Sequence, residues 1–362
     1  MKKRITALLL LFTLSVTSLL ACTSADKPES ATGKTSKTSK SINDKKTDLT
    51  PVTLNEVAHS IFYAPMYVAM EKNYFEKEGI DLSLVTGFGA DKTMTAVLSG
   101  TADIGFMGSE ASIYTYNEGA RDYVVNFAQL TQRAGNFLVA RENIKNFKWE
   151  DLKGRKVIGG RKGGMPEMVF EYILKQNHID PASDLTIDQN IDFGSTAAAF
   201  SEEKADYDFT VEFEPGATNL EKQGKGYVVA SLGTDSGYVP YTAFSAKKSY
   251  ISQHPEIIQG FTNALQKGMN YVASHTPEEI AQTIAPQFKE TTPDTITTIV
   301  SRYYEQDTWK KDLIFRQESF DLLQDILEDA GELRKRAPYK DLVTTTYAEN
   351  SAKPVKNTTL SH

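Results

Sequence analysis

The sequence is 362 residues long, with 40% hydrophobic and 24% charged residues and a formal net charge of −7 at pH 7. This composition is typical of a globular protein large enough for two α/β lobes, and without a basic excess we expect no nucleic-acid partner. One cysteine and five histidines exclude an internal disulfide framework and a Cys-cluster metal site, so we expect neither a metal nor a cofactor.

Residues 1–21 have the layout of a secretory signal. Three basic residues at positions 2–4 precede a mostly apolar stretch over 5–20, which is short for a membrane span. The stretch ends in Leu-Leu-Ala-Cys at 19–22, which resembles the lipobox of bacterial lipoproteins, whose cysteine becomes the lipidated first residue after cleavage. We therefore expect a protein tethered through Cys22 to the extracytoplasmic face of a bacterial cell membrane.

Residues 22–50 are mainly Ser, Thr, Lys, Asp and Gly, which predicts a flexible stalk. Beyond it, short apolar strands alternate with amphipathic helices. Strands are expected at 52–57, 80–86, 102–107, 124–131, 137–141, 156–158, 185–187, 208–213, 227–232 and 242–246. Helices are expected at 64–75, 91–98 with Asp91 as N-cap, 109–117, 166–176, 196–203, 216–222, 255–273, 277–284, 292–304 and 317–330. This order predicts an α/β fold with mainly parallel sheets covered on both faces.

The same order of elements predicts two lobes joined by a hinge. We place the first part of lobe 1 at 51–145, lobe 2 at 146–240, a return to lobe 1 with C-terminal helices at 241–345, and a polar tail at 346–362. In open α/β sheets, ligands bind beyond the carboxyl ends of the strands. The ligand cleft is therefore expected between the two lobes.

Two motifs carry a family resemblance. The run Phe-Tyr-Ala-Pro-Met-Tyr-Val-Ala-Met-Glu-Lys-Asn-Tyr-Phe-Glu-Lys-Glu-Gly-Ile at 62–80 and the run Leu-Ser-Gly-Thr-Ala-Asp-Ile-Gly-Phe-Met-Gly at 98–108 resemble motifs of the solute-binding proteins of ABC importers for nitrate, alkanesulfonates, taurine and thiamine pyrimidine precursors. The resemblance covers about 53–339. It implies a type II periplasmic-binding-protein fold, a monomer that closes on a small solute, and permease and ATPase subunits as partners.

Loops between a strand and the next helix are expected to line the cleft, because helix N-termini direct free N–H groups toward it. These loops and the hinge crossings contain the candidate ligand-binding residues His59, Phe62, Tyr63, Ser109, Glu110, Gln132, Gly163, Gly164, Met165, Glu167, Glu212, Glu214 and Tyr241. Phe62 or Tyr63 is expected to stack on the ligand, and one of Glu212 and Glu214 to contact it, with Glu214 as the expected hydrogen-bond acceptor. The Gly-Phe-Gly run at 87–89 is interpreted as a tight turn.

The charges of these loops bear on the ligand. They hold several glutamates and aromatic residues, and Arg133 and Arg161 are the nearby cations. An anion beside carboxylates is repelled, whereas a ring that carries an amine donates hydrogen bonds to them. We therefore expect a thiamine-related aminopyrimidine, with a flavin as a close second. An alkanesulfonate, taurine or nitrate is the alternative.

Two other classes of protein fit the sequence less well. Fungal pyrimidine-synthase relatives of this family carry a cysteine-rich motif and an essential histidine, but here the single cysteine is assigned to the lipid anchor. No Gly-x-Ser-x-Gly motif is present either, so we do not expect an enzyme. A sensory or adhesive lipoprotein is the remaining alternative.

Overall fold

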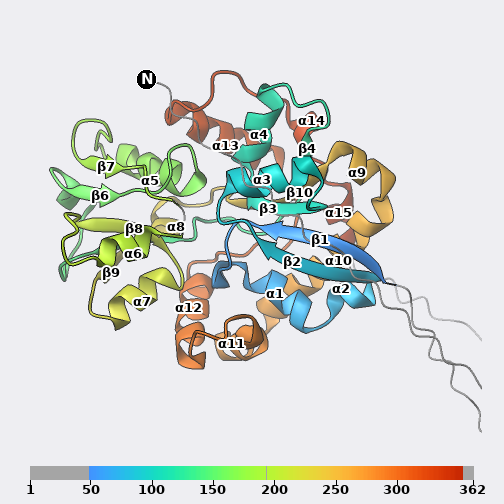
Figure 1. Ribbon diagram of the computed structural model, residues 1–362, viewed down its shortest axis with the longest axis horizontal. Helices are drawn as coiled ribbons and strands as arrows, with labels where there is room; N and C mark the ends of the chain where they lie inside the picture. Colours follow the sequence, from blue (N-terminus) through green and yellow to red (C-terminus); the bar gives the residue numbers. More distant parts are fainter. Residues whose placement is uncertain (1–48, 193, 354–362) are drawn as a thin grey trace, which may run out of the picture. The chain divides into compact units, whose positions relative to one another are not determined.

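The computed structural model describes residues 49–192 and 194–353, which belong to one compact unit (Figure 1). The predicted signal sequence, Cys22 and the predicted stalk up to residue 48 lie outside the described residues. No helix within those described ranges combines the length and hydrophobicity needed to cross a bilayer. The strands of this unit form two five-stranded sheets, each of which is the centre of one lobe.

The first sheet has the strand order β2-β1-β3-β10-β4. Its strands are β1 (Thr50–Glu56), β2 (Ile80–Thr86), β3 (Ile104–Gly108), β4 (Val124–Gln129) and β10 (Thr242–Lys247). β1 pairs in parallel with β2 and β3, so that Leu54 lies beside Leu84 on one side and Ile104 on the other. β10 runs antiparallel to both β3 and β4. The mainly parallel sheet of the sequence prediction therefore contains one reversed strand.

The second sheet repeats this plan in the order β7-β6-β8-β5-β9. Its strands are β5 (Asn136–Ala140), β6 (Lys156–Ile158), β7 (Thr186–Asp188), β8 (Phe209–Phe213) and β9 (Tyr227–Ser231). β5 is the reversed strand, antiparallel to β8 and β9. The predicted lobe boundary at 145 is wrong, because β5 already belongs to the second sheet and the chain crosses between the lobes at 130–135. It returns at 232–241.

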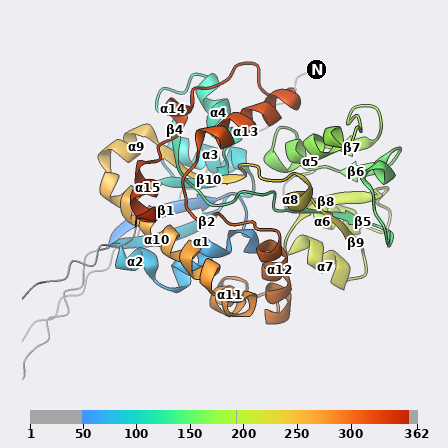
Figure 2. The same cartoon turned by 180° about the vertical axis from the view of Figure 1, so that it is seen from behind.

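Helices cover the sheets on both sides (Figures 1 and 2). Before the return crossing they are η1 (Ile61–Tyr63), α1 (Ala64–Glu71), α2 (Tyr74–Lys77), α3 (Ala90–Ser99), α4 (Glu110–Asn117), η2 (Trp149–Leu152), α5 (Met165–Gln176), α6 (Thr196–Ser201), α7 (Gly216–Lys222) and α8 (Leu232–Asp235). After it come α9 (Lys248–Gln253), α10 (Pro255–Ser274), α11 (Pro277–Ile284), η3 (Ala285–Gln287), α12 (Pro293–Glu305), α13 (Gln317–Asp329), α14 (Tyr339–Leu342) and α15 (Thr346–Ala352).

Three local predictions are corrected. The helix expected at 64–75 is broken between α1 and α2, because Asn73 has a φ of 55° and leaves the helical conformation. Gly89, not Asp91, is the N-cap of α3, and Asp91 lies in the first turn, where a carboxylate complements the helix dipole. Residues 346–352 of the expected polar tail form α15, which packs against α10 and buries Ala348.

The longest helix, α10, packs closely against α1 (Figure 2). The closest approach is at Gly268, where a Cβ atom would lie 2.1 Å from the carbonyl oxygen of Pro65 and 3.2 Å from Cβ of Ala69. No side chain fits at that separation. The glycine at 268 therefore sets the distance between the two helices and fixes α1, which follows directly after the loop that borders the cleft.

Candidate functional site

Three cavities are lined by residues of both lobes: two adjoining ones at the carboxyl ends of the strands, and a wider groove of about 1030 Å³ that shares Glu110 and Arg161 with the first of them. The first, which we call the Glu110 cavity, has a volume of about 40 Å³. The second, the Glu212 cavity, has a volume of about 250 Å³. Pro166 and Phe213 line both cavities, so the two adjoin each other. A ligand that contacts Phe213 can therefore reach into both.

The Glu110 cavity has mostly apolar walls. Besides Pro166 and Phe213 they include Val57, Tyr63, Gly164, Met165 and Tyr241. Tyr63 is buried and contacts Phe106 edge-on, with ring centroids 4.4 Å apart. Tyr241 is buried too, and its hydroxyl donates to the side-chain carbonyl of Asn136 in the second sheet. These contacts hold both tyrosine rings in place as fixed walls.

Glu110 contributes a buried carboxyl group to the lining of this cavity. It is the first residue of α4, directly after β3, and is 2% exposed. Its Oε2 has no hydrogen-bond partner among the described residues. Burial raises the pKa of Glu110 to about 7, although backbone hydrogen bonds and the charge of Arg161 favour the ionised form. A buried carboxyl oxygen without a partner is costly in the free protein and is available to a ligand.

Arg161 lines the edge of the same cavity. Its Nε lies 3.9 Å from Oδ1 of Asp91, with the Arg161 and Asp91 side chains 40% and 58% exposed. Such an exposed pair contributes little to stability. It links the loop before α5 to the first turn of α3, on opposite lobes.

The Glu212 cavity is more polar. It is lined by His59, Phe88, Asn136, Thr196, Glu212 and Glu214. Glu212 is buried and accepts hydrogen bonds from Thr210 at 2.6 Å and from Thr196 at 2.9 Å. Burial raises the pKa of Glu212 to about 7 in spite of these two hydrogen bonds. Its carboxyl group is thus held in one position at the cavity wall.

His59 presents its ring to this cavity without a free nitrogen. Nδ1 lies 2.8 Å from Oε1 of Glu56, and Nε2 lies 2.9 Å from the carbonyl oxygen of Gln287. Burial lowers the pKa of His59, but the hydrogen bonds to Glu56 and Gln287 outweigh it, and the net shift is upward. His59 therefore links β1 to η3 through hydrogen bonds of both ring nitrogens.

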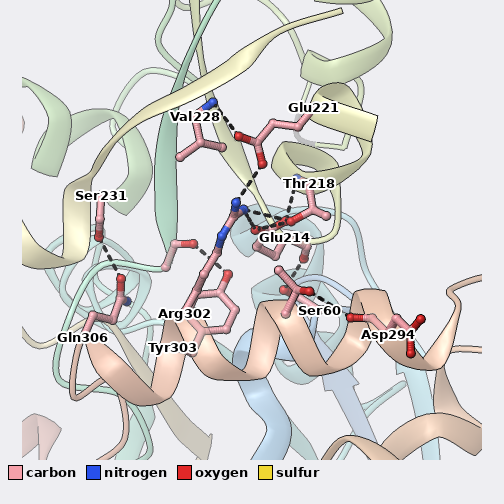
Figure 3. Close-up of polar contacts among 12 residues, drawn as sticks. Ser60, Glu214, Thr218, Glu221, Val228, Ser231, Asp294, Arg302, Tyr303 and Gln306 are labelled. Carbon is pink, nitrogen blue, oxygen red and sulfur yellow. Dashed lines mark hydrogen bonds and ion pairs between the residues drawn. The ribbon is translucent and has the colours of Figure 1, made fainter. Parts of the chain in front are cut away.

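Glu214 belongs to an ion-pair network (Figure 3). Its carboxylate accepts from the backbone N–H of Thr218 at 2.8 Å and from the Thr218 hydroxyl at 2.7 Å. Nη1 of Arg302, on α12, lies 2.7 Å from Oε1, and Nη2 donates to Glu221 at 2.7 Å. Ser60 donates to the Glu214 carbonyl oxygen at 2.7 Å. The predicted acceptor thus already has strong partners, and Glu110 has the free oxygen instead.

The remaining predicted residues line neither cavity. Phe62 is fully buried in an aromatic cluster that includes Tyr303. Ser109 is buried at the start of α4. Gln132 lies in the first crossing and donates to the carbonyl oxygen of Asp307 at 3.1 Å.

Gly163 and Glu167 form a hydrogen bond with each other in the second lobe. The N–H of Gly163 donates to Glu167 at 3.1 Å, and Gln189 donates to the same carboxyl group at 2.6 Å. Burial, with Glu171 nearby, raises the pKa of Glu167 to about 8. Neither residue lines the two cavities, although both lie close to Gly164 and Met165, which line the Glu110 cavity.

Among the site residues that sequence reasoning missed, three matter most for the arrangement. Phe213 lines both cavities, Phe88 lines the second, and Arg302 holds Glu214. Phe88 lies in the run interpreted only as a turn, and Arg302 lies on an amphipathic helix 88 residues from its partner. Over residues 49–192 and 194–353 no three His, Cys, Asp or Glu side chains are grouped to hold a metal ion.

The unfolding free energy of the ligand-free protein is expected to fall as the pH rises from about 5 to 8. The pKa values of Glu110 and Glu212 are raised to about 7 and that of Glu167 to about 8. Between the ordinary and the raised values the folded state binds more protons than the unfolded state, so stability decreases with pH. His59, whose pKa is also raised, acts in the same direction. Urea denaturation at pH 5.5 and 8 measures the difference, and equal stability at both would contradict it.

The chain is similar in sequence to a known protein family and to two proteins described as binding proteins. The family model described as NMT1/THI5 like matches residues 61–280. YtlA of Bacillus subtilis (strain 168), described as a candidate binding protein, is 46% identical over 301 residues, covering 83% of this chain and 90% of that protein. The riboflavin-binding protein RibY of Chloroflexus aurantiacus is 25% identical over 262 residues, covering 71% of this chain and 72% of RibY.

A solved structure shares the fold. The periplasmic nitrate-binding protein NrtA from Synechocystis PCC 6803 superposes with a TM-score of 0.68 at 16% identity, covering 84% of this chain and 89% of NrtA. The two-lobed arrangement with paired mixed sheets is therefore the periplasmic-binding-protein fold, as the sequence predicted.

Proposed function

Because this chain belongs to the NMT1/THI5-like family, we propose that it is the extracytoplasmic solute-binding component of an ABC importer. Its role is to capture a small solute and deliver it to the permease, without a chemical reaction. The lipobox-like run that ends at Cys22 supports a lipid anchor on the outer face of the cell membrane. The similarity to YtlA over most of both chains supports a binding role.

The ligand that fits the site best is a flat heterocycle that bears a hydrogen-bond donor. The observation that carries this proposal is the buried Oε2 of Glu110, which has no partner within the described ranges, on a residue that lines a cavity with aromatic and aliphatic walls. A ring amine or ring N–H supplies the missing hydrogen bond, and the ring buries apolar surface against Phe213. A thiamine-related aminopyrimidine or a flavin has this chemistry. The similarity to RibY supports the flavin.

Capture operates through closure of the two lobes. The chain crosses between the sheets at 130–135 and 232–241, and both cavities are lined by residues of both lobes. A ligand between the lobes gains contacts in the closed form that the open form lacks. It shifts the equilibrium toward closure by that difference in affinity.

Replacing Glu110 by glutamine is expected to affect binding and stability in opposite directions. At pH 8 the change removes a buried charge, so the unfolding free energy of the ligand-free protein rises by about 1–3 kcal/mol. The same change replaces the charged carboxylate with a neutral amide that has one accepting oxygen, so an amine-bearing ring binds roughly 10-fold more weakly. Calorimetric titration with aminopyrimidines, thiamine, riboflavin, taurine, alkanesulfonates and nitrate measures affinity, and urea denaturation measures stability.

Glu167→Gln is the matched control for this experiment. Glu167 is as buried as Glu110 and has a raised pKa, but it lines neither cavity. It should change the pH dependence of stability and leave the affinity unaltered. Binding of sulfonates or nitrate alone would refute the heterocycle and point to Arg161 and the start of α5 as an anion site.

A further inference from the structure

Phe88 has an unusual backbone conformation. It stands between Gly87 and Gly89 in the loop from β2 to α3, and its φ is 57°. An aromatic residue with a positive φ is a clear outlier, because its Cβ crowds the backbone. Its side chain is also 56% exposed, in contrast to the buried aromatic residues of both lobes. The ring of Phe88 is thus held outside the core by a strained backbone conformation.

Contacts of the two flanking glycines hold the backbone of Phe88 in place. The N–H of Gly87 donates to the carbonyl oxygen of Glu56 at 2.8 Å, and that of Gly89 to Val57 at 3.1 Å. A Cβ on Gly87 would lie 2.5 Å from Oδ1 of Asn55, so the backbone there is packed tightly against β1. Strain that is enforced in this way by the surrounding structure occurs mainly at functional sites.

The ring of Phe88 lies at the Glu212 cavity, between the two lobes. Phe88 lines the Glu212 cavity from the first lobe, together with His59 from the same lobe and Glu212 from the other. Across the cavity its Cδ1 is 3.8 Å from the position of a Cβ on Gly194, which precedes α6 of the second lobe. Phe88 is therefore both partly open to solvent and in contact range of the opposite lobe.

The aromatic residues predicted to stack on the ligand are less suited to it. Phe62 is completely buried, and Tyr303 and Tyr241 pack against its ring. Tyr63 is 1% exposed and packs against Phe106. Phe88 is 56% exposed and lines the cavity, so it can contact a ligand without rearrangement of the core.

We propose that Phe88 stacks on the bound heterocycle as the lobes close and sets the preference for aromatic over aliphatic solutes. This inference rests on the proposed function of the cleft. Phe88 contributes the ring contact from the first lobe, while Phe213 contributes the wall from the second, and Glu110 and Glu212 take the polar edge. Stacking requires only a flat π-face, so aminopyrimidines and flavins both satisfy it.

The test compares the affinities of wild type, Phe88→Gly, Phe88→Trp and Val85→Ala for riboflavin, a 4-aminopyrimidine and taurine by calorimetry. Phe88→Gly should weaken binding of the ring ligand about 10- to 100-fold, with faster dissociation, and Phe88→Trp should hold affinity within about threefold. Val85, also apolar and exposed, lies on the preceding strand outside both cavities, and its replacement should leave affinity unchanged.

A second readout separates this role from a structural one. Glycine adopts a positive φ without strain, so Phe88→Gly should melt at or above the temperature of wild type. A lower melting temperature together with unchanged affinity would overturn the stacking role. If wild type and Phe88→Gly bind the ring ligand with equal affinity, the stacking role of Phe88 is refuted and the proposed ligand class is not. Binding of no ring ligand by wild type would refute the proposed ligand class, and this inference with it.

Discussion

Arg302→Met is expected to lower the unfolding free energy by about 3–5 kcal/mol, because it leaves a buried carboxylate without its cation. The Glu214 side chain is completely buried, and Arg302 is 26% exposed. Arg302 bridges Glu214 and Glu221 with two 2.7 Å contacts (Figure 3). Methionine retains much of the aliphatic packing and removes only the charge and its donors. Equilibrium denaturation in urea at pH 7 measures the loss.

Two further variants make this prediction specific. The double variant Glu214→Gln/Arg302→Met removes the stranded charge and should recover at least half of the loss, since interacting residues are not additive. Arg155→Met breaks an ion pair with Asp208 in which the two side chains are 54% and 40% exposed. That change should cost no more than about 1 kcal/mol. Equal losses in Arg302→Met and Arg155→Met would contradict the role of the network.

Gly268→Ala is expected to destabilise the protein by about 3 kcal/mol or more, although alanine is the better helix former. The added methyl would lie 2.1 Å from the Pro65 carbonyl oxygen, and a backbone atom cannot turn aside as a side chain can. α1 and α10 must therefore separate. The expected result is a lower urea midpoint and a lower melting temperature, and a shift of α1 should also weaken ligand binding.

Gly260→Ala is the control on the same helix. There the added methyl would lie 3.3 Å from Cβ and the carbonyl oxygen of Glu78, a distance that a small adjustment relieves. The gain in helix propensity of about 1 kcal/mol offsets that adjustment, so the net change should be within about 1 kcal/mol. If Gly268→Ala proved as stable as Gly260→Ala, the close approach would not be a constraint.

The local elements were predictable where apolar periodicity and turn residues agree. β2, β6, α7 and α11 lie at the predicted residues, because alternation or helical spacing ends there close to Gly or Pro. The lobe to which β5 belongs was not predictable. β4 and β5 are neighbours in sequence and equally apolar, and only partners about 70 residues further on, such as Val211, show that β5 pairs in the second sheet.

The site was predictable as a set of loops but not as a set of roles. Strand-to-helix junctions did contribute Tyr63, Glu110 and Met165 to a cavity. Which glutamate has an oxygen free for a ligand depends on partners that lie far away in the sequence. Glu214 meets Arg302 across 88 residues, whereas Oε2 of Glu110 meets no partner in the described residues. Phe88 was missed because a strained φ leaves no signal beyond its flanking glycines.

The position of β10 has a consequence for synthesis. This strand lies between β3 and β4, so these two strands of the first sheet have no partner between them until residues 242–247 have left the ribosome. The second sheet is built from the continuous stretch 136–231 and has no such gap. A growing chain can therefore complete its second sheet first, while the first sheet keeps two unpaired edges. Folding of the first lobe therefore has to wait for the last strand of its sheet, whereas that of the second lobe does not.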